Sequence, residues 1–133
     1  MVLKPIALLY KLHYRNYGYK LGYTIPLNVF GKGLCIAHIG TIIVNSKCKI
    51  GDYCRIHCGV NIGGSEAPII GNYVYIGPGA KLFGKISIGD HCAIGANAVV
   101  NKSFEGEGLT IAGVPAKVIS HKGSYDVINV RQD

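Results

Sequence analysis

The feature that most constrains this sequence is an aliphatic residue that recurs every six positions. One unbroken series with this spacing consists of Ile70, Ile76, Leu82, Ile88, Ile94 and Val100. A second series with the same spacing lies upstream and consists of Val44, Ile50, Ile56 and Ile62. Eight positions separate Ile62 from Ile70, so two residues are inserted between the series. A short fixed period of this kind is typical of repeat architectures.

Two other positions of the repeat are also restricted. The position after the aliphatic residue favours Gly, with Asn or His among the exceptions, and these residues tolerate a left-handed backbone. We therefore expect a turn at Gly51, Gly63, Gly71, Gly77, Gly89, Gly95, Asn45, His57 and Asn101. The fourth position after the aliphatic residue is small and apolar, which predicts inward packing of Cys48, Cys54, Val60, Val74, Ala80, Cys92 and Ala98. Cys35 and Cys58 fall outside this phase.

One turn in every six residues predicts an all-β fold, a parallel β-helix. Three short strands complete a triangular coil, and each coil pairs with the next about 4.8 Å away. The aliphatic side chains then stack inside, so that each coil buries its neighbour. A mainly helical fold is excluded by the six-residue period and by the 19 glycines, which are poor helix formers.

The 133 residues are expected to form one domain with distinct ends. We predict an N-terminal helical cap over 1–22, the β-helix over 23–120 and a polar tail over 121–133. The predicted helix runs from about Lys4 to Asn16 and ends near Gly18. It either caps the open coil or packs on a neighbouring subunit, or else it touches a membrane surface, which its tyrosines and lysines would suit.

Charge and cysteine content narrow the function classes. The chain carries 14 Lys+Arg against 7 Asp+Glu, a net charge of +7, which suits an anionic partner such as coenzyme A or anionic lipid. No nucleic-acid-binding motif is present, so no nucleic-acid partner is expected. We see neither an apolar run of the roughly 18 residues that a membrane span needs nor a signal-peptide cleavage site. The five cysteines lack paired metal-ligand spacing, which predicts no metal and a cytoplasmic location with reduced thiols.

Three stretches of the sequence resemble one family. They are Gly33–Val44 (GLCIAHIGTIIV), Lys49–Gly64 (KIGDYCRIHCGVNIGG) and Ile111–Ile119 (IAGVPAKVI). Together they resemble the hexapeptide-repeat acyltransferases of the serine acetyltransferase-like branch, over roughly Tyr23 to Ser120. The resemblance implies a left-handed β-helix, acetyl-CoA as co-substrate and a homotrimer with active sites between subunits.

The chain also departs from the serine acetyltransferases. Their large N-terminal helical region is reduced here to about 20 residues. Ala37 precedes His38 where the family has Asp, Tyr23 aligns with the acid that orients the catalytic His, and Ala67 aligns near a second active-site His. We therefore expect an acetyl-CoA-dependent O-acetyltransferase that acts on a sugar hydroxyl in surface polysaccharide biosynthesis. The alternatives are a serine O-acetyltransferase of cysteine biosynthesis and a non-catalytic scaffold.

Acetyl transfer needs a base for the acceptor hydroxyl, and the resemblance assigns this role to His38. Counting back by six from Val44 places His38 inward, so a buried structural histidine is the alternative. His57 lies 19 residues further on and is expected one coil away, as an acceptor contact or a turn residue. Glu66 is the second candidate for acceptor binding and would orient His38 in place of the missing Asp, unless it belongs to a plain surface loop.

The resemblance also implies residues for the acetyl-CoA. Backbone N–H groups of Gly63, Gly64 and Ser65, at the two-residue insertion, would stabilise the oxyanion. Small residues allow close approach of the pantetheine arm, and the candidates are Gly77, Pro78, Gly79, Ala96 and Ala112. Lys117, with Lys102 or Lys122, would pair with the phosphates. The fold itself requires glycine at several of these positions, and each lysine alone is consistent with a solvated charge.

Overall fold

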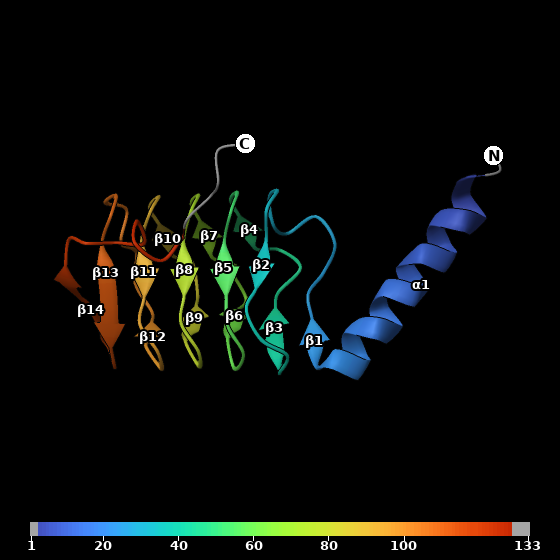
Figure 1. Cartoon of the computed structure of the whole chain (residues 1–133), viewed down its shortest axis with the longest axis horizontal. Coiled ribbons are helices and arrows are strands. Elements are labelled where there is room, and N and C mark those ends of the chain that lie inside the picture. The colour runs from blue at the N-terminus through green and yellow to red at the C-terminus, as the bar shows by residue number, and fades with distance from the viewer. Residues whose placement is uncertain (1–2, 129–133) are drawn as a thin grey trace.

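Short strands stacked coil upon coil make up the body of the molecule (Figure 1). The structure is a computed structural model that describes residues 3–128. Helix α1 (Leu3–Leu21) comes first. The strands that follow are β1 (Tyr23–Thr24), β2 (Cys35–Ile36), β3 (Ile42–Val44), β4 (Lys49–Ile50), β5 (Arg55–Ile56), β6 (Asn61–Gly63), β7 (Ile69–Ile70), β8 (Tyr75–Ile76), β9 (Lys81–Phe83), β10 (Ser87–Ile88), β11 (Ala93–Ile94), β12 (Val99–Val100), β13 (Thr110–Gly113) and β14 (Ala116–Ser120).

The strands form three sheets, and the chain visits them in turn. The first sheet has the order β1-β3-β6-β9-β12, the second has β10-β7-β4, and the third has β14-β13-β11-β8-β5-β2. All pairs are parallel except β13 with β14, which form an antiparallel hairpin. Each complete coil therefore gives one strand to each sheet, and the predicted parallel β-helix with an N-terminal helix is confirmed.

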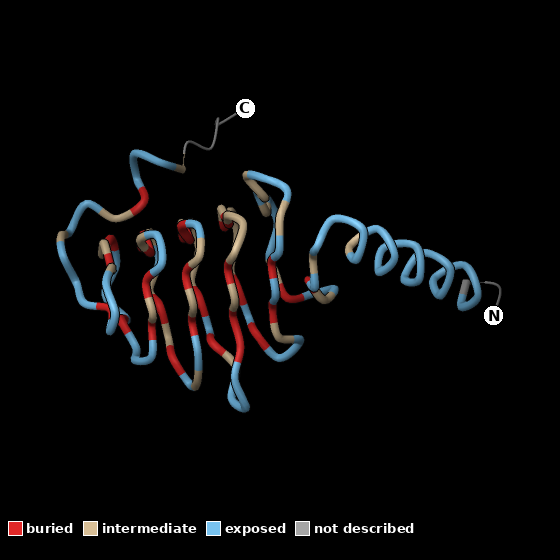
Figure 2. Tube along the Cα trace, turned by 90° about the horizontal axis from the view of Figure 1, so that it is seen from below, coloured by how far each residue is buried: buried red, intermediate tan, exposed pale blue. Residues whose placement is uncertain are grey.

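The aliphatic series forms the core. In the third sheet Ile56, Ile76, Ile94 and Ile111 are directly paired from coil to coil, and all are fully buried. Every member of the two predicted series is buried, and so is every member of the small apolar phase (Figure 2). Burial raises the pKa of the Cys54 thiol to about 12, so this cysteine is an unreactive core side chain.

The predicted cause of the glycine pattern is wrong. Left-handed backbone occurs at the third position after the aliphatic residue, for example at Tyr53, Tyr73 and His91, with φ of 55°, 54° and 55°. The glycine directly after the aliphatic residue is needed for space instead. A Cβ on Gly71 would lie 2.9 Å from the backbone nitrogen of Asp90 on the next coil.

The N-terminal helix is longer than the sequence predicted. It continues through Gly18 to Leu21, because one glycine inside a helix costs only about 1 kcal/mol. It ends before Gly22, whose φ of 81° is the left-handed conformation that commonly closes a helix. Within the described residues 3–128, no helix has both the length and the apolar character to span a membrane.

The chain after β14 turns back along the coils instead of leaving them. The backbone nitrogen of Ser124 donates to the carbonyl of His91 at 2.8 Å, and its hydroxyl donates to the carbonyl of Tyr73. Three ring contacts of 4.5–5.1 Å between centroids make one stack of Tyr53, Tyr73, His91 and Tyr125. This return, which no pattern in the sequence predicted, fixes the segment 121–128 against the body.

Adjacent isoleucines of β7 provide a matched test of the core. Ile70 is 2% exposed and Ile69 is 55% exposed, so only the first fills the column of stacked side chains. We expect Ile70→Ala to lower the free energy of unfolding by about 2–5 kcal/mol, and Ile69→Ala to change it by less than about 1 kcal/mol. Urea unfolding followed by circular dichroism measures both, and equal losses would contradict this assignment of the two faces.

Candidate active site at one corner of the coils

The candidate site lies at the corner where the chain passes from the third sheet to the first. Four turns stack there, at 37–41, 57–60, 77–80 and 95–98. We call these turns the histidine corner. Parallel pairing of the flanking strands aligns the turns in coil order, so residues about one coil apart in sequence become neighbours along this edge.

The first turn of the corner is two residues longer than the others. Ile36 pairs with Ile56, and Val44 pairs with Ile62, so eight positions in the first coil match six in the second. The additional residues push the turn outward, which leaves Ile39 75% exposed and His38 exposed. The alternative of a buried His38 is therefore wrong, because the insertion breaks the six-residue count between Val44 and Ile36.

Tyr23 holds the backbone of this long turn. Its hydroxyl donates a hydrogen bond of 3.1 Å to the carbonyl oxygen of His38. The tyrosine therefore acts on the main chain of His38. This contact restricts the turn that presents the imidazole, although it does not polarise the ring.

His57 stands beside His38 on the next coil, as the spacing predicted. The two ring centroids are 5.8 Å apart, and the rings of His57 and Tyr75 meet edge to face with centroids 5.1 Å apart. The Nε2 atom of His57 is buried and has no hydrogen-bond partner in the described residues. Burial lowers the pKa of His57, and the nearby Arg55 and His38 lower it further, so the ring is neutral at pH 7.

Arg55 is a site residue that the sequence analysis missed. It lies two positions before His57, and alternate residues of a strand share a face. One guanidinium nitrogen, Nη1, donates to the carbonyl of Val127 at 3.4 Å, while the buried Nε has no hydrogen-bond partner among residues 3–128. The sequence offered one signal for it: Arg55 occupies the outward position directly before an aliphatic residue, and Tyr75 occupies the same position one coil later.

The predicted acetyl-CoA residues separate into two groups, and the larger lies at the histidine corner. Gly77, Pro78 and Gly79 form the third turn, and Ala96 belongs to the fourth. The register continues to β13, where Ala112 directly follows Ile111 and pairs with Lys117 of β14. One edge of the molecule therefore carries two histidines, then a run of small residues, then a lysine.

The second group lies at a different corner. Gly63 ends β6, and Gly64, Ser65 and Glu66 follow it in the turn to β7, where the chain passes from the first sheet to the second. Ser65 and Glu66 are exposed, and the carbonyl of Gly64 accepts a 3.1 Å hydrogen bond from Asn45. Within one chain the fold does not bring Glu66 or this glycine loop to His38.

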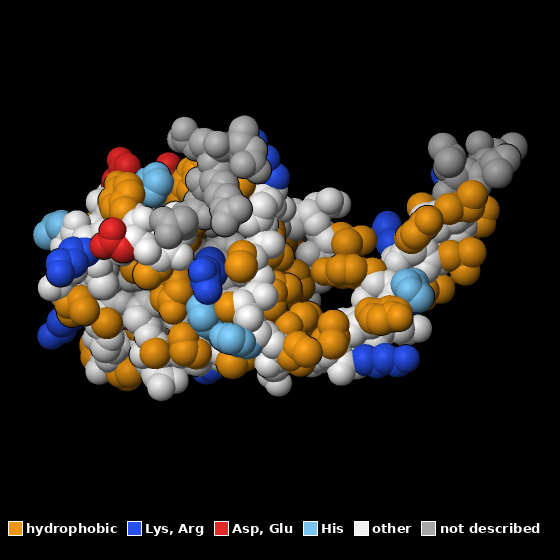
Figure 3. Space-filling view, in the orientation of Figure 1, with side chains coloured by type: hydrophobic (Ala, Val, Ile, Leu, Met, Phe, Trp, Pro, Cys, Tyr) orange, Lys and Arg blue, Asp and Glu red, His pale blue; other side chains and the backbone are white. Residues whose placement is uncertain are grey.

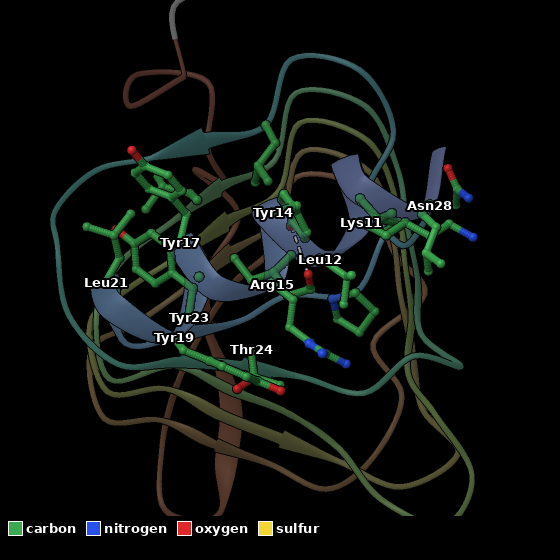
Figure 4. Close-up of a pocket in the computed structure, with 17 residues that line it drawn as sticks. Lys11, Leu12, Tyr14, Arg15, Tyr17, Tyr19, Leu21, Tyr23, Thr24 and Asn28 are labelled. Atoms are coloured by element: carbon green, nitrogen blue, oxygen red, sulfur yellow. Dashed lines mark hydrogen bonds between the residues drawn. The ribbon is translucent and has the colours of Figure 1, made fainter. Parts of the chain in front are cut away.

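One hollow of the described residues lies at neither corner. It has a volume of about 810 Å³ and lies between α1 and the first coil (Figure 4). Leucines, tyrosines, Ile25 and Pro26 line it together with Lys11 and Arg15. Within residues 3–128, no group of three or more His, Cys, Asp or Glu side chains is arranged to hold a metal ion.

Comparison with known proteins agrees with the repeat fold. Residues 67–102 match the family described as bacterial transferase hexapeptide (six repeats). The chain is a hexapeptide-repeat protein similar to the serine acetyltransferases. It is 35% identical over 99 residues to the serine acetyltransferase of Synechococcus elongatus, which covers 70% of this chain and 40% of that protein. It is 40% identical over 96 residues to the serine acetyltransferase of Helicobacter pylori strain J99, and this match covers 68% of this chain and 56% of that protein.

Solved structures of serine acetyltransferases show the same fold. The Brucella abortus enzyme superposes with a TM-score of 0.70 at 32% identity, covering 87% of this hexapeptide-repeat protein and 53% of that chain. A structure of that enzyme with coenzyme A superposes with a TM-score of 0.66 at 37% identity, covering 71% of this chain and 40% of that chain. The Neisseria gonorrhoeae enzyme in complex with serine superposes with a TM-score of 0.63 at 34% identity, covering 68% of this chain and 39% of that chain. This chain thus spans about 40–56% of the length of the two sequence relatives.

The lowered pKa of His57 predicts a pH-dependent stability. The unfolded chain takes up the proton near the ordinary pKa of 6.5, whereas the folded chain does so only at lower pH. Between these values the unfolded state binds more protons, so stability falls as pH falls through this window. We expect His57→Gln to weaken this dependence below about pH 6.5. Urea unfolding at pH 5.5 and 7.5 measures the difference in unfolding free energy between the two pH values. His13→Gln on α1 is the control. If His57→Gln leaves this difference unchanged, the assignment is contradicted.

Proposed function

We propose that this protein is an acetyl-CoA-dependent O-acetyltransferase with His38 as the general base. The observation that carries the proposal is the exposed His38 beside a second histidine, at the head of an edge lined by small residues. The serine acetyltransferases that resemble this chain, one of them solved with coenzyme A, support the class of reaction. The chain spans only part of their length, so the activity rests on the corner as well as on the likeness.

The corner supplies the chemistry in a direct transfer. A neutral imidazole of His38 takes the proton of the acceptor hydroxyl, and the oxygen attacks the thioester carbonyl carbon. The carbon–sulfur bond then breaks, and the imidazolium returns the proton to the leaving thiolate. Tyr23 holds the main chain of His38 during this step, and neutral His57 adds no second positive charge beside the imidazolium.

The small residues of the lower turns would receive the pantetheine arm. A Cβ on Gly77 would lie 2.9 Å from the backbone nitrogen of Ala96, so the third and fourth turns pack closely against each other. Because Gly77 has no side chain, the backbone at this point stays open to a ligand. Exposed Pro78 and Ala96 border this edge. Lys117, exposed on β14 and paired with Ala112, stands where a phosphate could meet it.

We further propose a homotrimer whose sites lie between subunits. The loop with Gly63, Gly64, Ser65 and Glu66 lies away from His38 in its own chain. In a trimer, the same loop of a neighbouring copy could reach the histidine corner, where its N–H groups would stabilise the oxyanion. The likeness to hexapeptide-repeat transferases supports this assembly.

Serine is the acceptor that the comparisons favour. The sequence relatives are serine acetyltransferases, and one similar structure holds serine. Arg55 adds an independent reason, since its positive charge lies close enough to His57 to lower the pKa of that ring, and a guanidinium suits a carboxylate. A sugar hydroxyl of a surface polysaccharide precursor is the second candidate. It is favoured by Ala37 and Tyr23, which stand where serine acetyltransferases carry acids.

Removal of the base tests the proposal directly. We expect purified protein to release free thiol from acetyl-CoA when serine or a sugar acceptor is added. His38→Ala should lower kcat/KM by about 100-fold or more, which is the usual contribution of a positioned base. His13→Ala, a histidine on α1, should leave the rate unchanged. Full activity of His38→Ala would contradict the assignment, and absence of both thiol release and coenzyme A binding would instead indicate a non-catalytic scaffold.

Substitution of Arg55 distinguishes the two acceptors. We expect Arg55→Gln to raise the KM for serine by about tenfold, because a charge-assisted hydrogen bond to the carboxylate is lost. The rate with a neutral sugar should not change, and Arg55→Lys should recover part of the affinity for serine. An equal loss with both acceptors would show that Arg55 supports the structure of the corner and does not bind the carboxylate.

A further inference from the structure

The hollow between helix α1 and the first coil has no part in the proposed function. Its volume of about 810 Å³ lies within the range of roughly 300–1,000 Å³ that is usual for small-molecule sites. Hydrophobic side chains gather on both sides of it, with Leu8 and Leu12 on the helix and Leu34 and Ile36 on the coil (Figure 3). Exposure of such a surface to water is unfavourable, and apolar grooves of this size commonly bind a ligand.

Fixed contacts at the C-terminal half of α1 hold the hollow in shape. The Tyr14 hydroxyl donates a 2.8 Å hydrogen bond to the carbonyl of Ile25, and both residues line the hollow. The carbonyl of Gly22, directly after the helix, accepts a 3.1 Å hydrogen bond from the backbone nitrogen of Ile42 on β3. The hollow is therefore formed before any ligand enters it.

The charge at the hollow indicates an anionic ligand. Lys11 and Arg15 line it, and none of the described residues that line it is acidic (Figure 4). The two cations are four residues apart, so they lie on one side of the helix, and their long side chains can reach a single anionic group. A phosphate, which carries nearly two negative charges at pH 7, suits two cations better than a carboxylate does.

Three other occupants fit the hollow less well. A flat bilayer would meet Leu9 and Tyr10, which are 66% and 73% exposed and do not line the hollow, whereas the cations Lys11 and Arg15 do. The α1 helix of a second copy would add further cations, because α1 contains no acidic residue. Coenzyme A supplies phosphates, but its largely polar body would leave the leucines of the hollow unmatched.

We propose that the hollow is a binding site for an anionic amphiphile, a molecule with one apolar chain that ends in a phosphate. The chain lies along the leucines of α1 and the first coil, and the phosphate lies between Lys11 and Arg15. Tyr23 lines this site and also donates to the carbonyl of His38, so the hollow and the histidine corner are neighbours. Binding in the hollow does not depend on the proposed activity.

Calorimetric titration of the full chain with dodecyl phosphate, below its micelle concentration, tests the inference. We expect saturable binding that is at least about tenfold tighter than that of dodecyl maltoside or dodecyltrimethylammonium, which carry the same chain on a neutral and a cationic head group. Lys11→Gln with Arg15→Gln should weaken the binding of dodecyl phosphate at least about tenfold and leave that of dodecyl maltoside unchanged. The matched control, Lys47→Gln with Lys85→Gln, removes the same charge from exposed residues of the coils and should bind dodecyl phosphate normally.

A variant of the apolar lining provides a second test. Leu27 lines the hollow and is 46% exposed, so Leu27→Glu places a carboxylate beside the cations without removing a core side chain. It should weaken the binding of dodecyl phosphate, whereas Ile69→Glu, at a residue of β7 that is 55% exposed, should not. Circular dichroism should show that the coils of each variant remain folded.

Four results would overturn the inference. The first is absence of saturable binding, and the second is an equal loss of affinity in the two double variants. The third is displacement of dodecyl phosphate by coenzyme A, which would place the ligand in the cofactor site. The fourth is light scattering in which dodecyl phosphate separates associated copies of the chain, which would make a second copy the occupant of the hollow.

Discussion

The rest of this structure depends on the stacking of aliphatic side chains inside the coils. Each coil places the same few inward residues above those of its neighbour, so the register of every strand is set by its buried side chain. A slip of one residue would turn these side chains outward, which makes the register strongly specified. Turns are consequently aligned along the corners, and residues a coil apart in sequence become neighbours in space.

The candidate active site lies where this regular arrangement is interrupted. The two-residue extension of the first turn leaves the flanking strands in register and pushes His38 out of the core. The rigid coil below then places His57 beside it and aligns the small residues of the later turns along the same edge. A site on a scaffold of this kind is positioned by the backbone ladder, with little freedom for its parts to move apart.

Much of the fold could be predicted from the sequence, because a six-residue period has one simple structural explanation. Three features could not be predicted in this way, each for a physical reason. The glycine after each aliphatic residue reflects a close approach of adjacent coils, which depends on the stacking distance and not on local backbone preference. The exposure of His38 was not predicted, because the six-residue count from Val44 ran across the two-residue insertion. Phe30 and Ile36, which are again six residues apart, mark the correct inward positions before it. The helix passed Gly18 because a left-handed glycine four residues later provides the better end.

The site could be predicted only in part. The pairing of His38 with His57 followed from the length of one coil, whereas Arg55 and Tyr75 were overlooked because outward positions of a repeat show no pattern of their own. The loop with Glu66 follows from an insertion in the sequence, but only the sheet order shows that it lies at another corner.

The most direct measurement of the central claim is a crystal structure of this protein with coenzyme A. We predict the thiol beside His38, the pantetheine arm along the turns that contain Gly77 and Ala96, and a phosphate near Lys117. Coenzyme A bound in the hollow under α1, or away from both histidines, would contradict the assignment of the histidine corner as the active site.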